Sequence, residues 1–355
     1  MSNLTESLKN NIKTGWESPS NIALVKYWGK YDNQLPQNPS VSFTLSTAAT
    51  RTFVTYSESN HEGMDVSFLF DGHENAPFKS RIEKFLNQMS SEYFPFLKNG
   101  HIAIETSNSF PHSSGIASSA SAMSALALCL CDIENSLNGN TTFSDAFFRK
   151  ASFISRLASG SACRSVFPLM AVWGLVPTVA GSSEEWAIGF SEDIHPVFHN
   201  FHDDILIISP NEKSVSSSAG HQLMENNPYA PARYTQAGDR LKTLLVAIRD
   251  GDIDTFGKIT EAEALTLHAL MMCSDPAYIL MEEGSLTVIK KIQKFRVETG
   301  IPVWFTLDAG PNVHVLYPAD ADQQVQSFII SELKPYCHEG KIIRDKVGTG
   351  PKKIS

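Results

Sequence analysis

The sequence predicts an α+β protein with two domains. Residues 21–55 read as strands, and residues 41–56 are rich in β-branched and aromatic side chains. Residues 231–273 and 284–298 read as long helices. Each half also contains some of the other element, which favours two α+β halves over a regular alternation of strands and helices. A chain of 355 residues is long enough for two domains and a large core.

The composition is typical of a globular protein and argues against several functional classes. It is 42% hydrophobic and 19% charged, with a net charge of −9 and no cluster of lysine or arginine, so we expect no nucleic-acid partner. No segment approaches the roughly 20 apolar residues of a membrane span, and the first residues lack the apolar core of a secretory signal. The five scattered cysteines predict free thiols, so we expect a cytoplasmic protein without a membrane partner.

The first half is expected to begin with a polar lead-in over residues 1–18. Strands broken by a polar loop are expected over 21–55, and further strands over 166–190. Helices are predicted at 78–98, 115–135 and 144–158, the last because Ser144 and Asp145 precede apolar residues at helical spacing.

The second half contains a short buried strand at 204–209, followed by a serine-rich loop at 214–218 that leads into a helix. After the two long helical stretches, residues 302–308 and the sequence VHVLY read as two strands joined by a tight loop. The polar stretch near 192–203 is the best boundary, which gives predicted domains 1–195 and 196–355.

Residues 110–122, FPHSSGIASSASA, are the most informative segment. Small residues let the backbone approach a ligand closely, and a helix that begins here directs unpaired N–H groups at that ligand. Serine hydroxyls add donors, or ligands to a Mg²⁺ ion carried by phosphates. The segment therefore reads as a phosphate-binding loop, although it is not a Walker loop. The alternative is an alanine-serine helix packed closely against a neighbour.

Lys26 lies in the segment NIALVKYWGK, residues 21–30. If this segment is a strand, Lys26 shares a face with Leu24 and Trp28. A buried ammonium needs a carboxylate or an anionic ligand. The alternative is a lysine on an edge strand whose amine reaches water.

Arg164 lies in the segment SGSACRS, residues 159–165. If this loop opens a helix, Ser159 and Ser161 converge with free N–H groups, and Arg164 can offer two parallel donors to a carboxylate. An ordinary serine cap followed by a surface arginine is equally compatible with this segment alone.

Asp308 stands in TLDAGPN, where a strand ends and a tight glycine turn begins. Loops held by rigid strands often carry catalytic groups. Taken alone, the segment favours the alternative, a turn aspartate that bonds its own backbone.

Three histidines, His195, His199 and His202, have a spacing that could bind a metal. They lie in a polar linker without a second ligand cluster, so we expect no metal site there. The sequence also lacks a Ser-His-Asp elbow motif and a GxGxxG segment after a strand, which leaves serine hydrolases and dinucleotide-binding folds unsupported.

The four segments that carry Lys26, the serine loop, Arg164 and Asp308 occur together in one known family. From about Asn21 to Leu316 the chain resembles the diphosphomevalonate decarboxylases of the GHMP kinase superfamily. Residues 110–120 resemble the phosphate loop of the superfamily, while NIALVKYWGK, SGSACRS and LDAGPN are typical of the decarboxylase branch. The resemblance implies two α+β domains with the active site in the cleft between them, and a homodimer.

The resemblance also implies an activity. The family converts ATP and (R)-5-diphosphomevalonate into isopentenyl diphosphate, ADP, phosphate and CO₂, with Mg²⁺ bound beside the nucleotide. Asp308 matches the aspartate that faces the 3-hydroxyl, Lys26 the lysine paired with it, and Arg164 the arginine that holds the substrate carboxylate. The remaining expected substrate ligands are Tyr27, Lys30, Ser159 and Ser161.

The expected nucleotide site combines the phosphate loop with two further segments. Ser119 is also the expected ligand to Mg²⁺, Asn108 lies in a segment that reaches toward the nucleotide, and Ser217 matches a loop that closes over ATP. The expected ATP ligands are Asn108, Ser114, Gly115, Ala117, Ser118, Ser119 and Ser217.

Some positions depart from the family pattern. Where the loop commonly runs LASSAAG, this chain has IASSASA, with Ser121 and Ala122 in place of Ala and Gly. Pro168 and Leu169 stand where Gly-Gly is frequent, and Ala158 where glycine is frequent. These changes affect loop geometry but leave every charged residue of the implied mechanism in place.

Two other functions are compatible with the same segments. One is a small-molecule kinase that phosphorylates mevalonate or a related hydroxy acid without decarboxylation. Such a kinase could dispense with Asp308 or Arg164, and both are present. The other is a non-catalytic relative that binds ATP or an anion. Loss of Lys26, Arg164 or Asp308 would favour it, and none is lost.

Overall fold

Two long antiparallel strands, β1 (Asn11–Val25) and β4 (Ser40–Glu58), form the centre of the larger sheet. The structure is a computed structural model that describes residues 11–59, 63–110, 117–191, 193–211 and 214–355. The strand order is β14-β1-β4-β7-β5-β6, with β8 paired to β4 and β9 paired to β8. The other strands are β5 (Gly63–Phe70), β6 (His73–Glu74), β7 (Asn99–Asn108), β8 (Met170–Trp173), β9 (Ala187–Gly189) and β14 (Lys352–Lys353).

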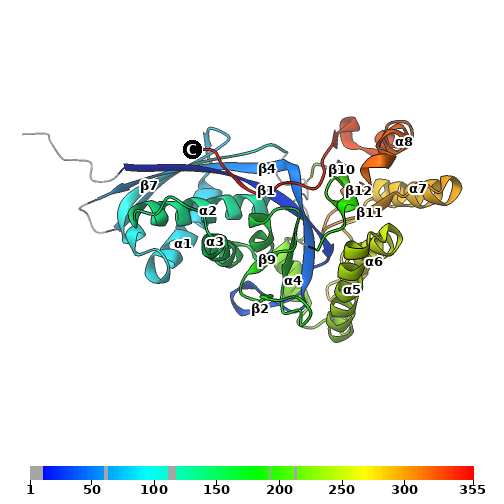
Figure 1. Cartoon of the computed structure of the whole chain (residues 1–355), viewed down its shortest axis with the longest axis horizontal. Helices are drawn as coiled ribbons and strands as arrows, with labels where there is room; N and C mark the ends of the chain where they lie inside the picture. Colours follow the sequence, from blue (N-terminus) through cyan, green and yellow to red (C-terminus); the bar gives the residue numbers. More distant parts are fainter. Residues whose placement is uncertain (1–10, 60–62, 111–116, 192, 212–213) are drawn as a thin grey trace, which may run out of the picture.

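Three helices cover one face of this sheet, α1 (Ala76–Glu92), α2 (Ser118–Leu137) and α3 (Asp145–Ala158) (Figure 1). Helix α2 contacts both β1 and β4 and is buried along most of its length. Its alanines and serines allow this close approach, because small side chains leave room for the neighbouring strands. The N-terminus of α2 is thereby fixed at the end of the sheet where the two halves meet.

The smaller sheet has the strand order β11-β12-β10-β13. Helices α5 to α7 pack beside it (Figure 1), with α6 and α7 against β11. The strands are β10 (His202–Leu206), β11 (Trp304–Thr306), β12 (Val313–Tyr317) and β13 (Ile342–Ile343), and the short strands β2 (Lys30–Tyr31) and β3 (Leu35–Pro36) pair separately. The helices are α4 (Ser217–Leu223), α5 (Ala230–Asp250), α6 (Ile253–Met272), α7 (Glu283–Thr299) and α8 (Asp322–Phe328).

The two halves share a hydrophobic core and the end of the chain. One buried cluster joins Phe43 of β4 with Leu241 of α5 and Phe256 of α6. The chain then returns to the larger sheet, where β14 pairs with β1 (Figure 1). Asp345, on the way back, accepts hydrogen bonds from the backbone N–H groups of residues 46–48. These contacts join the two halves of the protein.

The α+β architecture agrees with the sequence prediction, and several element limits differ. Residues 11–18 belong to strand β1, so the predicted polar lead-in is wrong there, because pairing with β4 and β14 extends the strand. The predicted helix at 78–98 ends at Glu92, and Pro95 begins a separate 3-10 turn. The helical stretch 231–273 is two helices divided at Gly251, whose positive φ ends α5.

The predicted strand through residues 21–30 is also wrong beyond Val25, where β1 ends. Lys26 therefore does not alternate with Leu24 and Trp28 on a strand face, although it is buried. Within the described part of the chain, the structure contains no helix with the length and apolar character of a membrane span. The domain limits 1–195 and 196–355 stay a prediction.

Candidate active site

A cavity of about 430 Å³ opens where the two halves meet. All of the predicted site residues that the structure describes line this one cavity. From the first half these are Lys26, Tyr27, Lys30, Asn108, Ala117, Ser118, Ser119, Ser159, Ser161 and Arg164, and from the second half Ser217 and Asp308. Ser114 and Gly115 lie outside the described residues. The structure thus brings the predicted residues together, while their roles stay predictions.

Lys26 and Asp308 form a partly buried ion pair in the cavity wall. Lys26 Nζ donates a hydrogen bond to Asp308 Oδ1 over 2.9 Å, with the lysine side chain 2% exposed and the aspartate 26% exposed. Burial lowers the pKa of Lys26, and the neighbouring Asp308 carboxylate opposes this shift. The pair keeps one carboxylate oxygen on the lysine and leaves the carboxylate at the edge of the cavity.

Asp308 is held by the turn that follows strand β11. The N–H of Gly310 donates to the Asp308 carbonyl oxygen over 2.7 Å. His268 Nε2, on α6, lies 3.1 Å from the same oxygen. A carbonyl can only accept, so His268 carries its proton on Nε2 in this contact. The backbone contacts of Asp308 therefore fix the turn, and its side chain bonds Lys26.

Arg164 is 2% exposed and is held by neutral partners. Its Nε donates to Ser42 Oγ over 3.1 Å and to Asn21 Oδ1 over 3.3 Å, and its Nη1 donates to Ser40 Oγ over 2.7 Å. Among the described residues, no carboxylate forms an ion pair with Arg164, and burial lowers its pKa. A buried guanidinium facing a cavity without a carboxylate partner is a strong site for an anion.

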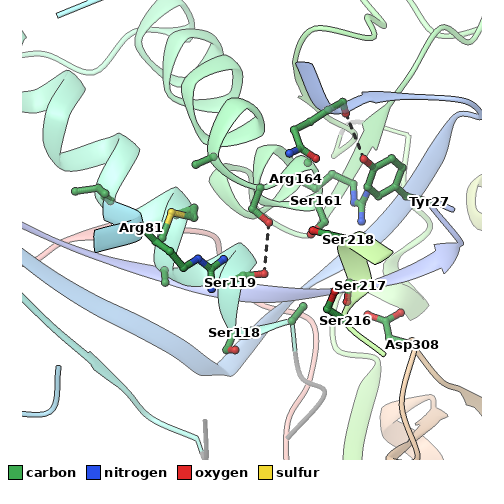
Figure 2. Close-up of a pocket in the computed structure, with 18 of the residues that line it drawn as sticks. Tyr27, Arg81, Ser118, Ser119, Ser161, Arg164, Ser216, Ser217, Ser218 and Asp308 are labelled. Atoms are coloured by element: carbon green, nitrogen blue, oxygen red, sulfur yellow. Dashed lines mark hydrogen bonds between the residues drawn. The ribbon is translucent and has the colours of Figure 1, made fainter. Parts of the chain in front are cut away.

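The segment SGSACRS forms the 3-10 helix η3 (Gly160–Val166), and Ser159 precedes it. The loop thus opens a helical turn, which is the condition under which the sequence places its serines close together. Figure 2 shows Ser161 and Arg164 on one wall of the cavity and the hydrogen bond between the hydroxyls of Ser119 and Ser159, 3.4 Å apart. This bond connects the loop with the first turn of α2.

The start of α2 is shaped for close contact with a ligand. Ala117, which precedes the helix, has φ 43° and ψ 42°, a left-handed conformation that is uncommon for alanine. Ser118 and Ser119 follow on the cavity wall. The N-terminal N–H groups of a long helix attract negative charge, so this end of α2 suits a phosphate.

Tyr27 and Lys30 converge on Gln34, on the cavity wall. The Tyr27 hydroxyl donates to the backbone oxygen of Gln34 over 3.3 Å, and Lys30 Nζ donates to its Oε1 over 2.8 Å. Burial raises the pKa of Tyr27 and lowers that of Lys30. At neutral pH the tyrosine therefore remains a neutral donor.

We call the part of the cavity around Lys26, Tyr27, Lys30, Arg164 and Asp308 the charged end. An apolar end lies beyond the start of α2. It is lined by Phe68 and Phe70 of β5, Phe78 and Ile82 of α1, Ile104 of β7, and Met123 and Leu126 of α2. Figure 2 shows Arg81 of α1 reaching toward Ser119, between the two ends. This end suits a flat apolar group joined to phosphates.

Sequence reasoning missed the apolar end and several supporting residues. His221 of α4 is buried in the cavity wall, where its Nδ1 accepts the N–H of Gly29 over 3.0 Å and its ring packs on Tyr27 and Trp28. Burial lowers the pKa of His221 to about 3, so the ring is neutral. A single histidine in a sequence segment with a helical pattern does not indicate such a role.

Two of the three linker histidines have contacts within the protein. His195 Nδ1 accepts the N–H of Val197, and the ring of His202 stacks on Tyr317 at 4.8 Å. No cluster of three or more His, Cys, Asp or Glu side chains with metal-binding geometry occurs in the described residues.

Comparisons with known proteins identify the relatives of this chain. The model of a diphosphomevalonate decarboxylase-like N-terminal domain matches residues 18–182, and that of a mevalonate 5-diphosphate decarboxylase C-terminal domain matches residues 204–354. The chain is 30% identical over 331 residues to the diphosphomevalonate decarboxylase of Gibberella zeae, an alignment that covers 88% of this chain and 82% of the relative.

Solved structures agree with these matches. The mevalonate diphosphate decarboxylase of Staphylococcus aureus superimposes with a TM-score of 0.83 at 27% identity, covering 98% of this chain and 99% of the other. The structure of MDDEF in complex with MVAPP, AMPPCP and magnesium superimposes with a TM-score of 0.82 at 28% identity. The superposition covers 98% of this chain and 100% of the other. The chain belongs to the diphosphomevalonate decarboxylase family.

Proposed function

We propose that this protein catalyses the ATP-dependent decarboxylation of (R)-5-diphosphomevalonate to isopentenyl diphosphate, with release of ADP, phosphate and CO₂. The observation that carries this proposal is the placement of Arg164, without a carboxylate partner in the described residues, in one cavity with the Lys26–Asp308 pair. A kinase needs a base near a hydroxyl, whereas decarboxylation also needs a site for the substrate carboxylate. Both are present.

The charged end supplies the groups that the reaction requires. The Asp308 carboxylate accepts the proton of the substrate 3-hydroxyl. It also faces the positive charge that develops at the carbon that bears this hydroxyl. Lys26 orients the Asp308 carboxylate through the 2.9 Å bond. The Arg164 guanidinium holds the two oxygens of the substrate carboxylate until CO₂ leaves.

The diphosphate is expected beside Tyr27, Lys30, Ser159 and Ser161, which offer a neutral hydroxyl, an ammonium and two serine hydroxyls on adjoining walls. Diphosphate carries several negative charges, and Lys30 and the N–H groups of η3 are the local donors that an acidic protein must provide. Activity on mevalonate 5-phosphate equal to that on the diphosphate would show that this part of the assignment is wrong.

The cavity also fits ATP and Mg²⁺. The strained Ala117, the serines that follow it and Arg81 would hold the phosphates, Ser119 would ligate the metal, and the apolar end would take the base. Asn108, whose Oδ1 accepts the Thr50 hydroxyl, and Ser217 line the same cavity. When bound, Mg·ATP supplies the phosphoryl group that makes the 3-hydroxyl a leaving group.

Two further properties are part of the proposal. The family resemblance supports a homodimer, which light scattering coupled to size-exclusion chromatography tests directly. All five cysteines are free thiols, which supports a reducing cytoplasmic location. Fractionation of cells that contain the protein tests the location.

The central experiment measures ADP and CO₂ together after mixing the protein with ATP, Mg²⁺ and diphosphomevalonate. We expect both products in a one-to-one ratio, and neither without the divalent cation. ADP without CO₂ would identify a kinase and overturn the proposed function. Binding of ATP without either product would identify a non-catalytic relative.

A further inference from the structure

The backbone of Lys26 is held by residues from the other half of the protein. Strand β1 ends at Val25, so the peptide groups of Lys26 no longer bond to a neighbouring strand. Instead, its N–H donates to Glu263 Oε2 over 2.9 Å, and its carbonyl oxygen accepts from Arg233 Nη2 over 3.2 Å. Asn38 Nδ2 donates to the same carbonyl over 3.0 Å. The N–H and the carbonyl oxygen of Lys26 are thus hydrogen-bonded to the two members of one ion pair, Glu263 and Arg233.

This ion pair is fully buried between α5 and α6. Arg233 Nη1 donates to Glu263 Oε1 over 2.6 Å and Nη2 donates to Oε2 over 2.5 Å, with side chains 1% and 0% exposed. Removing two charges from water is expensive, and apolar residues of similar size often serve stability as well or better. A buried pair at this position therefore points to a role other than stability.

We propose that the Glu263–Arg233 pair is a positioning device that fixes the direction of the Lys26 side chain toward Asp308. The Nζ of a lysine lies at the end of four rotatable bonds, so the orientation of its Cα decides where the amine can reach. The pair fixes that orientation by bonding the N–H and the carbonyl of Lys26. The Glu263 carboxylate also adds negative charge near the lysine, which opposes the loss of its proton.

The proposal rests on the proposed function, since it gives Lys26 a task in catalysis. The two ideas are nevertheless separable, because the Lys26 Nζ–Asp308 Oδ1 distance can be measured without any turnover. A wild-type protein that releases no CO₂ would remove the proposed function and leave this distance as the test of positioning.

The chain contains a matched control on the same helix. Glu261, two residues before Glu263 on α6, forms a bidentate ion pair with Arg296 of α7. Arg296 Nη1 donates to Glu261 Oε1 over 2.8 Å and Nη2 donates to Oε2 over 3.1 Å. Both pairs join α6 to a neighbouring helix and both are largely buried. Only the Glu263 pair touches Lys26.

The experiment compares Glu263→Gln with Glu261→Gln. Each change keeps the size of the side chain and removes one charge. We expect both variants to lose melting temperature, Glu263→Gln more because Glu263 also bonds Arg240. Only Glu263→Gln should lower kcat, by about 10- to 100-fold, because a misplacement of about 1 Å can cost about 100-fold. KM for ATP should stay within about twofold in both variants, since uniform binding is untouched. In a crystal structure of Glu263→Gln, the Lys26 Nζ–Asp308 Oδ1 distance should lengthen.

A second pair of variants keeps the proposal testable if Glu263→Gln does not fold. Arg233→Lys keeps the charge but cannot span both carboxylate oxygens and the Lys26 carbonyl. Arg240→Gln removes a 2.9 Å bond to Glu263 Oε1 without any contact to Lys26. We expect a fall in kcat for Arg233→Lys and near-normal kcat for Arg240→Gln. Equal effects within either pair of variants, or an unchanged Nζ–Oδ1 distance, would overturn the proposal.

Discussion

The charged end and the apolar end of the cavity differ in where their supporting contacts come from. At the charged end, Lys26 bonds Asp308, Glu263 and Arg233, which lie 282, 237 and 207 residues further along the chain. At the apolar end, Ile104 belongs to a hydrophobic cluster built within the first half. The charged end therefore exists only when both halves are docked, whereas the apolar end is complete in one half.

This difference predicts different consequences of substitution. Changes at the charged end remove groups that act on the reacting atoms, so they should lower turnover. Changes at the apolar end remove contacts made equally in the ground state and the transition state, so they should raise KM and spare kcat. Four substitutions test this division.

The largest effect is expected for Asp308→Asn. The change keeps the shape of the side chain and removes its negative charge and its basic site. Turnover should fall by about 10²–10⁴-fold, the usual range for the loss of a general base. The affinities for ATP and substrate, measured by calorimetry, should change little.

Asp320→Asn, an exposed carboxylate in the same half, is the control and should keep full activity. If Asp308→Asn keeps more than about a tenth of the wild-type kcat, well above that range, Asp308 is only a turn residue.

Arg164→Gln is expected to have the next largest effect. A guanidinium that pairs two carboxylate oxygens becomes a neutral amide, and a hydrogen bond to a charged group is worth about 1.5–3 kcal/mol. The value of kcat/KM should therefore fall about tenfold or more. A buried guanidinium without an ion-pair partner is itself costly, and the Ser40 and Ser42 hydroxyls that Arg164 bonds can rotate to other partners, which a backbone carbonyl cannot do. Removal of Arg164 should therefore leave the melting temperature nearly unchanged.

Arg156 offers a matched comparison for this prediction. It is equally buried and also bonds neutral oxygens, the backbone carbonyls of Asn33 and Glu185, but it does not line the cavity. Arg156→Gln should lower the melting temperature more than Arg164→Gln and kcat/KM less. The reverse order would mark Arg164 as a structural arginine.

The two ends also differ in how far the sequence predicts them. Arg164, Ser159 and Asp308 stand in the short segments SGSACRS and TLDAGPN, each of which is ambiguous when read alone. Their joint occurrence in one family is what made these residues candidates, so the sequence could place them in the cavity. The strand predicted through Lys26 was wrong, because the backbone there is bonded by Glu263 and Arg233 instead of a neighbouring strand. Contacts across more than 200 residues leave no local pattern.

The apolar end was not predicted for a different reason. Ile82, Ile104 and Met123 occur at ordinary helix and strand spacings, where apolar residues usually mean core packing. Some of the same side chains do belong to the core of the first half. Their second role as a cavity wall follows only from the way β5, β7, α1 and α2 meet.

A smaller effect is expected for Ser119→Ala, at the junction between the two ends. The change removes one hydroxyl from the first turn of α2, worth about 1 kcal/mol as a net hydrogen bond. KM for Mg·ATP should rise by about fivefold, and extra Mg²⁺ should restore part of the loss if the hydroxyl ligates the metal. Ser136→Ala, at the exposed far end of α2, is the control. An unchanged KM for Mg·ATP would remove Ser119 from the nucleotide site.

The smallest effect is expected for Met123→Ala, which enlarges the apolar end. Met123 lines the cavity and packs only partly within the core of the first half, so its loss should cost little stability. Its side chain would contribute about 1 kcal/mol of apolar contact with the base, equivalent to about a fivefold higher KM for ATP. The substrate KM and kcat should stay close to the wild-type values, because the charged end is untouched. Leu137→Ala, at the exposed end of the same helix, controls for changes in helix stability. If Met123→Ala lowers kcat as strongly as Arg164→Gln, the two ends do not work separately, and the division between chemistry at one end and nucleotide affinity at the other is wrong.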